Sequence, residues 1–348
     1  MFLSKISNAL FVISLLLITA CSEPVIDSET ELQELQLTGY TMGPIVYSVK
    51  LIGKKQHVEE IQLAQKVDDL LKKINAQMST YDKNSELSKF NQYQGNDARQ
   101  ISVELNQVLT ESIRLAELTE NTLDVTIGPL VNLWSFGPEK RAEKVPSQEL
   151  ILATKQHIGI DKLNLENRLL SKSDANVYVD LSAIAKGFAV DKVAELLEQY
   201  DINNYIVDIG GEMRVGGQKT DGDDWVIAVE KPISGTRAVQ KAIIPGDNAV
   251  ATSGDYRNYF EDNGVRYSHT IDPKTGWPIN HKLVSVTVVH PSSMTADGLA
   301  TAIEVMGPEK GFEFAKANNL AVFLISKTEN GFSEQSTEQF MRLVAKPK

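Results

Sequence analysis

The chain of 348 residues contains a single cysteine, Cys21. No disulfide can therefore form within the chain, and a catalytic thiol is not expected. Basic residues are also scarce, because 35 lysines and arginines stand against 46 acidic residues and give a formal net charge of -11. No basic cluster stands out along the chain, which argues against nucleic acid as a partner.

Several catalytic motifs are missing as well. The chain has no G-x-S-x-G elbow, no H-E-x-x-H zinc motif and no G-x-x-x-x-G-K-[ST] phosphate loop. The glycine-rich run 210–217 joins two predicted strands rather than a strand and a helix, so it fails the dinucleotide-binding fingerprint and predicts a β-turn. Neither an internal repeat nor a low-complexity block is present.

The apolar run at the N-terminus is too short to cross a membrane. Met1–Ala20 carries Lys5 as its only charge, then an apolar core and small residues, a pattern typical of a secretory signal. Leu17–Cys21 resembles the bacterial lipobox, so we expect a lipidated Cys21 and a protein anchored on the periplasmic side of a bacterial membrane. Ser22 in place of Asp favours the outer membrane over the inner one. The alternative is an ordinary signal with an incidental cysteine.

This pattern divides the chain into three parts. We expect a signal peptide over residues 1–20 and then a lipidated cysteine with a polar, acidic tether over 21–37. Residues 38–348 remain for the folded body, enough for one large domain or two closely joined ones.

Apolar spacing along this body predicts an α+β fold. We expect helices over 57–78, 103–118, 182–200, 294–306 and 309–317, and strands over 40–52, 205–209, 225–230, 239–244, 249–252, 283–289 and 320–325. Strands do not alternate regularly with helices. The pattern therefore favours mixed or antiparallel sheets with packed helices over a doubly wound parallel sheet.

Asp297 and Thr301 are the clearest candidate metal ligands. They lie four residues apart in a predicted helix, so both oxygens would project from one helix face. Magnesium is usually held by one or two protein oxygens together with water and substrate phosphates, which suits so sparse a pair. The alternative is a solvated helix face with no ligand.

Other polar residues stand in suggestive places. Gly43 near the start of the first strand would permit close backbone approach to a ligand, and Asp124 in an apolar run needs a donor partner. Asp180 precedes a predicted helix that has Lys186 in its second turn. The acid could cap that helix, and the helix N-terminus could instead attract an anion. We expect no nearby base that would make Ser253 a nucleophile.

Taken in order, the motifs of the chain resemble the ApbE family of FAD:protein FMN transferases over nearly the whole length after the leader. The segments that carry the resemblance are Met42-Gly43, Tyr81–Asn91, Asp124–Leu130, Asp180–Asp191, Ser253–Arg257, His269–Gly276 and Ala296–Ala302. Two departures are visible: Pro44 stands where the family often has Thr, and Ser182 where it often has Gly. Neither removes a charged or metal-binding group.

The resemblance implies an ApbE-like, T-fold-related architecture and a Mg²⁺-dependent reaction. FMN would pass from FAD to a Thr or Ser hydroxyl of a target protein, forming a phosphoester and releasing AMP. His269 would be the general base, since an imidazole suits such a proton transfer; the alternative is a hydrogen-bonded histidine at a strand end. The implied FAD site comprises Met42, Tyr81, Thr122, Leu123, Asp124, Asp180, Lys186 and Ile271, and the implied Mg²⁺ ligands are Asp297, Thr301 and the backbone oxygen of Ala183.

Two other activities remain open on the sequence. A Mg²⁺-dependent FAD pyrophosphatase giving FMN and AMP would need the same metal and diphosphate site with water as the acceptor. A flavin-binding lipoprotein without chemistry would not need a base, so His269, Asp297 and Thr301 argue for catalysis. The resemblance implies targets among flavin-bearing subunits of membrane redox pumps and related exported electron-transfer proteins.

Overall fold

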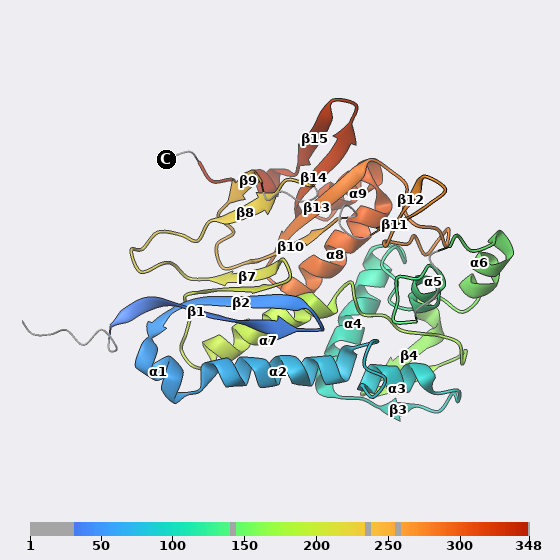
Figure 1. Cartoon of the computed structure of the whole chain (residues 1–348), viewed down its shortest axis with the longest axis horizontal. Helices are drawn as coiled ribbons and strands as arrows, with labels where there is room; N and C mark the ends of the chain where they lie inside the picture. The colour runs from blue at the N-terminus through green and yellow to red at the C-terminus, as the bar shows by residue number, and fades with distance from the viewer. Residues whose placement is uncertain (1–30, 140–143, 234–237, 255–258, 347–348) are drawn as a thin grey trace, which may run out of the picture.

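The computed structural model describes residues 31–139, 144–233, 238–254 and 259–346, so the expected signal, Cys21 and Ser22 lie outside the described residues. Within this part, eight strands form one sheet whose spatial order follows the chain (Figure 1). In that order they are β1 (Leu32–Thr41), β2 (Ile45–Lys54), β6 (Tyr205–Ile209), β7 (Glu212–Gly216), β10 (Ala249–Ser253), β13 (Leu283–His290), β14 (Ala321–Thr328) and β15 (Gly331–Ser336).

All neighbouring strands of this sheet pair antiparallel, as the sequence predicts. The pairing is long at most positions; β1 and β2, for example, stay in register from Leu32 opposite Lys54 to Thr41 opposite Ile45. Between β7 and β10 it narrows to two residue pairs, Ala249 with Arg214 and Val250 with Met213. The sheet thus consists of two halves joined by a narrow seam.

Three small sheets and a set of helices complete the described chain. The small sheets are β3 (Arg99–Gln100) with β5 (Leu169–Lys172) and β4 (Leu163–Glu166), β8 (Ile227–Glu230) with β9 (Val239–Ile243), and β11 (Tyr259–Asp262) with β12 (Val265–Ser268). The helices are α1 (Lys55–Glu60), α2 (Leu63–Met78), α3 (Glu86–Gln92), α4 (Val103–Leu118), α5 (Gly128–Leu133), α6 (Gln148–Lys155), α7 (Ala185–Glu198), α8 (Ser293–Met306), α9 (Pro308–Ala317) and α10 (Glu338–Met341), with a 3₁₀ turn at Ile160–Lys162.

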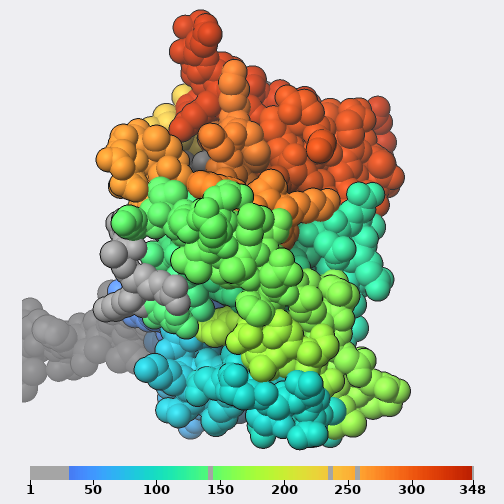
Figure 2. All heavy atoms as spheres, turned by 90° about the vertical axis from the view of Figure 1, so that its right-hand side faces the viewer, coloured from blue at the N-terminus to red at the C-terminus, as the bar shows by residue number. Residues whose placement is uncertain are grey.

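The core lies on both faces of the main sheet. On one face, α7 and α8 pack directly on the strands, with α2 and α4 beyond them, and Phe188, Leu299 and Val286 belong to the same buried cluster (Figure 1). The opposite face is covered by β8, β9 and α10, where Trp225 and Phe340 are buried. In Figure 2 the N-terminal elements, blue to cyan, lie at one end of the molecule and the C-terminal elements, orange to red, at the other.

The predicted first strand over 40–52 is wrong. The structure has a hairpin there, because Met42 and Gly43 adopt positive φ angles of 48° and 85° and turn the chain from β1 into β2. Gly43 therefore lies in a turn rather than in a strand. In the described part of the chain, β1 begins at Leu32, within the segment predicted as a tether, and it pairs with β2 along its whole length.

Most other predicted elements are present with shifted ends. The helix over 103–118 and the strand over 205–209 agree with α4 and β6. The helix over 57–78 is interrupted at Gln62, whose φ is 52°, and the helix over 182–200 begins at Ala185. The short elements α3, α5, α6, α10, β3, β4, β5, β7, β11, β12 and β15 were not predicted, and β7 takes up most of the run 210–217 that predicted a β-turn. In the described part of the chain, no helix combines the length and the apolarity of a membrane span.

Candidate active site

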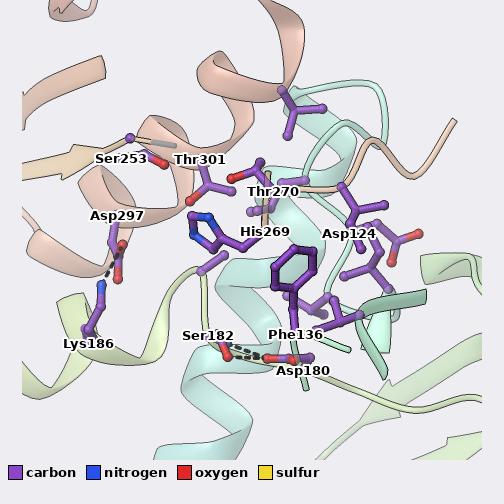
Figure 3. A pocket seen from close by; sticks show the side chains of 18 of the residues that line it. Asp124, Phe136, Asp180, Ser182, Lys186, Ser253, His269, Thr270, Asp297 and Thr301 are labelled. Atoms are coloured by element: carbon purple, nitrogen blue, oxygen red, sulfur yellow. Dashed lines mark hydrogen bonds and ion pairs between the residues drawn. The ribbon is translucent and has the colours of Figure 1, made fainter. Parts of the chain in front are cut away.

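One cavity of about 440 Å³ collects nearly all the side chains that the sequence singles out (Figure 3). Its wall includes the predicted residues Tyr81, Thr122, Leu123, Asp124, Asp180, Ala183, Lys186, His269, Ile271, Asp297 and Thr301. Met42 lines a neighbouring cavity of about 770 Å³, which shares Tyr81, Asp180 and Lys186 with the first. Segments far apart in the chain therefore meet at one place.

The close crossing of α7 and α8 builds the charged end of this cavity. A Cβ at Gly187 would lie 2.3 Å from the carbonyl oxygen of Ser293 and 2.8 Å from the Cα of Met294, so a glycine is needed for this approach. As a result the Gly187 N–H donates to Asp297 Oδ2 at 3.0 Å. The same crossing leaves Lys186 Nζ 3.7 Å from Asp297 Oδ1 (Figure 3).

Asp191 of α7 fixes the start of α8. Its carboxylate accepts hydrogen bonds from Ser292 Oγ at 2.8 Å, from the Ser293 N–H at 2.9 Å and from the Met294 N–H at 3.0 Å. These N–H groups have no partner within their own helix, and an acid at a helix N-terminus also interacts favourably with the helix dipole. The two helices are thus tied both at Gly187 and at Asp191.

One lysine and two buried acids meet behind the crossing. Lys186 Nζ also lies 2.9 Å from Glu212 Oε2. Burial opposes the charge of Lys186, but the carboxylates of Asp297 and Glu212 outweigh it and raise the pKa of the ammonium group. Burial raises the pKa of Glu212 to about 7, against the pull of Lys186, and raises that of Asp297 against Lys186 and the Gly187 N–H. One ammonium group is thus shared by two carboxyl groups.

Asp124 and Asp180 hold the opposite wall through short local bonds. Asp124 Oδ1 accepts from the Thr126 N–H at 2.8 Å and from Thr126 Oγ1 at 2.6 Å, which supplies the donors that its burial requires. Burial raises the pKa of Asp124, and the Thr126 donors partly oppose the rise. The Asp180 N–H donates to the Val125 oxygen at 2.7 Å, so the two acidic segments lie side by side.

The alternative that Asp180 caps the following helix is wrong. Helix α7 starts at Ala185, its N-cap residue is Ile184, and no side chain caps it. Asp180 Oδ1 instead accepts from the Ser182 N–H at 2.8 Å and from Ser182 Oγ at 2.5 Å (Figure 3). These bonds fix the loop that leads into α7, and Lys186 consequently lies in the first turn of the helix rather than the second.

His269 follows β12 directly and lines the cavity. Its ring meets the ring of Phe136 edge-on, with 6.3 Å between centroids and 73° between planes. Phe136 in turn packs on Phe260, and Trp134 contacts Phe260, Tyr267 and Trp277. The imidazole thus packs edge-on against a cluster of aromatic rings while remaining in the cavity wall.

The expectation that Ser253 has no nearby base is wrong, because its hydroxyl donates to Glu304 Oε2 from α8. Glu212 and Phe136 also line the cavity and were not predicted there. The sequence did carry a signal for the two acids. Glu304 lies seven residues after Asp297 on the same face of the predicted helix, and Glu212 follows the Gly210-Gly211 turn. Nothing in the sequence around Phe136 indicates its contact with His269.

Ala183, Asp297 and Thr301 line the same cavity, as a shared metal site requires. Within the described part of the chain, no three His, Cys, Asp or Glu side chains gather closely enough to hold a metal ion by themselves. One carboxylate, one hydroxyl and one backbone carbonyl would leave coordination positions for water and for phosphate oxygens, the arrangement that Mg²⁺ commonly adopts.

Comparison with known proteins gives one consistent result. The model of the ApbE family matches residues 42–324. The FAD:protein FMN transferase of Vibrio cholerae is 49% identical over 333 residues, which cover 96% of this chain and 97% of the relative. The protein of the same description from Haemophilus influenzae is 49% identical over 351 residues, 97% of each chain.

Solved structures agree. The flavin transferase ApbE from Vibrio cholerae superposes with a TM-score of 0.83 at 49% identity and covers 90% of this chain and 100% of its own. The apo form of the flavinyl transferase ApbE from Pseudomonas stutzeri also gives 0.83, at 38% identity, over 90% of this chain and 97% of its own.

Proposed function

The chain belongs to the ApbE family, and from this premise we propose that its cavity binds FAD together with Mg²⁺ and passes FMN to a Thr or Ser hydroxyl of a target protein. The protein is an enzyme, a transferase that moves FMN from FAD to target proteins. The metal, the acceptor hydroxyl and the role of each side chain are the proposed part.

The acidic side chains of the cavity wall support the proposed metal ion. Its described wall holds four acidic side chains, Asp124, Asp180, Glu212 and Asp297, against Lys186 as its one lysine or arginine. A diphosphate entering such a wall without a cation would meet net repulsion. Asp297, Thr301 and the Ala183 carbonyl would hold a divalent cation, which would offset that charge and supply stabilisation of negative charge on the leaving phosphate.

The FAD contacts divide by their chemistry. Lys186 faces the diphosphate, and Tyr81, whose side chain is 68% exposed at the meeting of the two cavities, offers a ring face for stacking. The other proposed FAD contacts are Met42, Thr122, Leu123, Asp124, Asp180 and Ile271.

His269 accepts the proton of the target hydroxyl as the hydroxyl oxygen attacks the FMN phosphorus. A phosphoester bond forms, the phosphoanhydride bond to AMP breaks, and AMP leaves. The contact of His269 with Phe136 holds the imidazole in the cavity wall. No other histidine of the described chain lines that wall.

The test is mass spectrometry of a soluble form lacking Met1–Cys21, incubated with FAD, Mg²⁺ and a Thr-bearing target domain while AMP release is followed. We expect the target to gain one FMN, and we expect the gain to stop with a chelator and to fall strongly in Asp297→Ala. AMP and free FMN beside an unmodified target would indicate a pyrophosphatase instead. Bound FAD without AMP would indicate a carrier.

We propose that the protein is a periplasmic lipoprotein anchored through Cys21. Ser22 favours the outer membrane. Flavin-bearing subunits of membrane redox pumps, which are membrane-bound as well, are the proposed targets. Labelling of the full chain with a fatty acid, lost in Cys21→Ala, tests the anchor.

A further inference from the structure

Glu304 lies directly behind the cavity wall. It is 0% exposed, and it stands on the same face of α8 as Asp297 and Thr301, which precede it by seven and three residues. Glu304 itself does not line the cavity, whereas its neighbour Val305 and the two residues that it binds do. The helix face that carries the proposed metal ligands thus continues into a buried carboxylate.

Glu304 binds two hydroxyl groups of the wall. Ser253 Oγ, at the end of β10, donates to Glu304 Oε2, and Thr270 Oγ1 donates to the same oxygen at 3.4 Å. Thr270 directly follows His269, and its backbone is fixed on both sides, because its N–H donates to Ser268 Oγ at 3.1 Å and its oxygen accepts from the Ile279 N–H at 2.9 Å. Ser253 and Thr270 therefore form a fixed corner beside the imidazole.

The corner has a defined hydrogen-bonding character. A hydroxyl has one proton to donate and two lone pairs to accept with. Because Ser253 and Thr270 give their protons to Glu304, the oxygens that they turn to the cavity can only accept. Phosphate oxygens are acceptors as well, so this corner suits N–H or O–H donors and disfavours the diphosphate, for which Lys186 lies at the charged end.

We propose that Glu304 is a positioning residue that makes the Ser253–Thr270 corner a hydrogen-bond-accepting site for the target protein. The target segment that carries the Thr or Ser docks there by donating its backbone N–H groups. The corner then presents the target hydroxyl to His269 while FAD occupies the remainder of the cavity. This inference rests on the proposed function, since it assigns a place to the second substrate of that same reaction.

The test measures the KM for the target domain, by FMN gain at saturating FAD and Mg²⁺, alongside the Kd for FAD. Glu304→Gln keeps the shape of the side chain, but its amide can donate to Ser253 Oγ and turn the hydroxyl proton into the cavity. Ser253→Ala removes the acceptor itself. Each variant is expected to raise the KM for the target about tenfold, the effect of roughly one hydrogen bond, with kcat and the Kd for FAD changed less than about threefold.

Glu111→Gln is the matched control. Glu111 accepts a hydrogen bond from Thr295 Oγ1 at 2.7 Å, so this variant also changes a carboxylate that binds a hydroxyl of α8, but outside the cavity wall. Its KM for the target is expected to stay unchanged. The effects on the KM for the target are expected to be less than additive in the double variant Glu304→Gln with Ser253→Ala, because Glu304 acts partly through the serine.

An unchanged KM for the target in both single variants would overturn the inference, and so would fully additive effects in the double variant. A higher Kd for FAD with an unchanged KM for the target would place FAD in the corner and overturn it as well. Ser253 is partly exposed, so Ser253→Ala carries the test even where Glu304→Gln does not fold. Failure of the proposed function would appear differently, as no FMN gain with the unsubstituted protein.

Discussion

At the scale of single residues, the site is defined by one lysine that two acidic side chains share. Lys186 faces both Glu212 and Asp297; the two acids are buried, and the lysine is partly exposed. Removing one member of such a cluster leaves the others without their partner, which is costly in a buried setting. The excess acid in this arrangement is what a divalent cation would neutralise.

His269→Ala is expected to separate binding from chemistry. The variant should keep the affinity for FAD within about threefold and lose transfer by roughly 10²- to 10⁴-fold, the usual contribution of a general base. Titration of FAD fluorescence and the rate of AMP release in the presence of target measure the two quantities.

His57→Ala on α1, which lies outside the cavity wall, is the control and should match the unsubstituted protein. An equal loss of FAD binding and transfer in His269→Ala would count against the base assignment.

Single residues also show how far the sequence alone reaches. Asp297 and Thr301 could be found because their spacing places them on one helix face. The sequence places Glu212 and Glu304 near other site residues but does not assign their roles, because their partners Lys186 and Ser253 lie 26 and 51 residues away in the chain and reach them only through the packed fold. The same holds for Phe136, whose partner His269 is reached only across the cavity.

At the scale of elements, the crossing of α7 and α8 decides the geometry of the site. The crossing is possible because Gly187 has no side chain to meet the backbone of Ser293. Periodicity predicted both helices but not their contact, since spacing reports which face is apolar and not which element covers it. The start of α7 was misjudged because a loop fixed by Asp180 takes the place of its first predicted turn.

Gly187→Ala is expected to lower the free energy of unfolding by about 2–4 kcal/mol, because a methyl group would overlap backbone atoms that cannot rotate away. It should also weaken FAD and Mg²⁺ binding, since Lys186 and Asp297 would be pushed apart. Urea unfolding and FAD titration measure both effects.

Gly298→Ala on α8 is the matched comparison. Its Cβ would meet Leu115 Cδ1 at 2.6 Å, the far end of a flexible side chain, so a milder loss of stability is expected. Equal losses in the two variants would mean that the helix crossing is not the sensitive point.

At the scale of the whole molecule, the sheet order was beyond the reach of the sequence. The irregular mixture of strands and helices predicted mixed or antiparallel sheets, but it did not predict the pairing of β1 with β2, because residues 32–37 read as a polar linker. Their alternation of exposed and half-buried positions becomes meaningful only beside β2, where Leu35 and Leu37 pack against the main core.

The boundary can be tested by truncation. A protein that begins at Thr38 loses Leu35 and Leu37 and leaves part of β2 without its neighbour, so it should be about 2 kcal/mol less stable than one that begins at Glu31. The expected fall in melting temperature is about 3 °C. A protein that begins at Ser22 serves as the control and should melt with the one that begins at Glu31. Equal melting of all three would restore Thr38 as the start of the folded body.

The narrow seam between β7 and β10 also divides the chemistry. Lys186 and Glu212 come from the half before the seam, and His269, Asp297 and Thr301 from the half after it. A chain cut between β7 and β8 would therefore yield two fragments, each with only part of the catalytic residues, and their reassociation could be measured as flavin transfer. The same seam makes this fold a natural scaffold for a split-enzyme reporter.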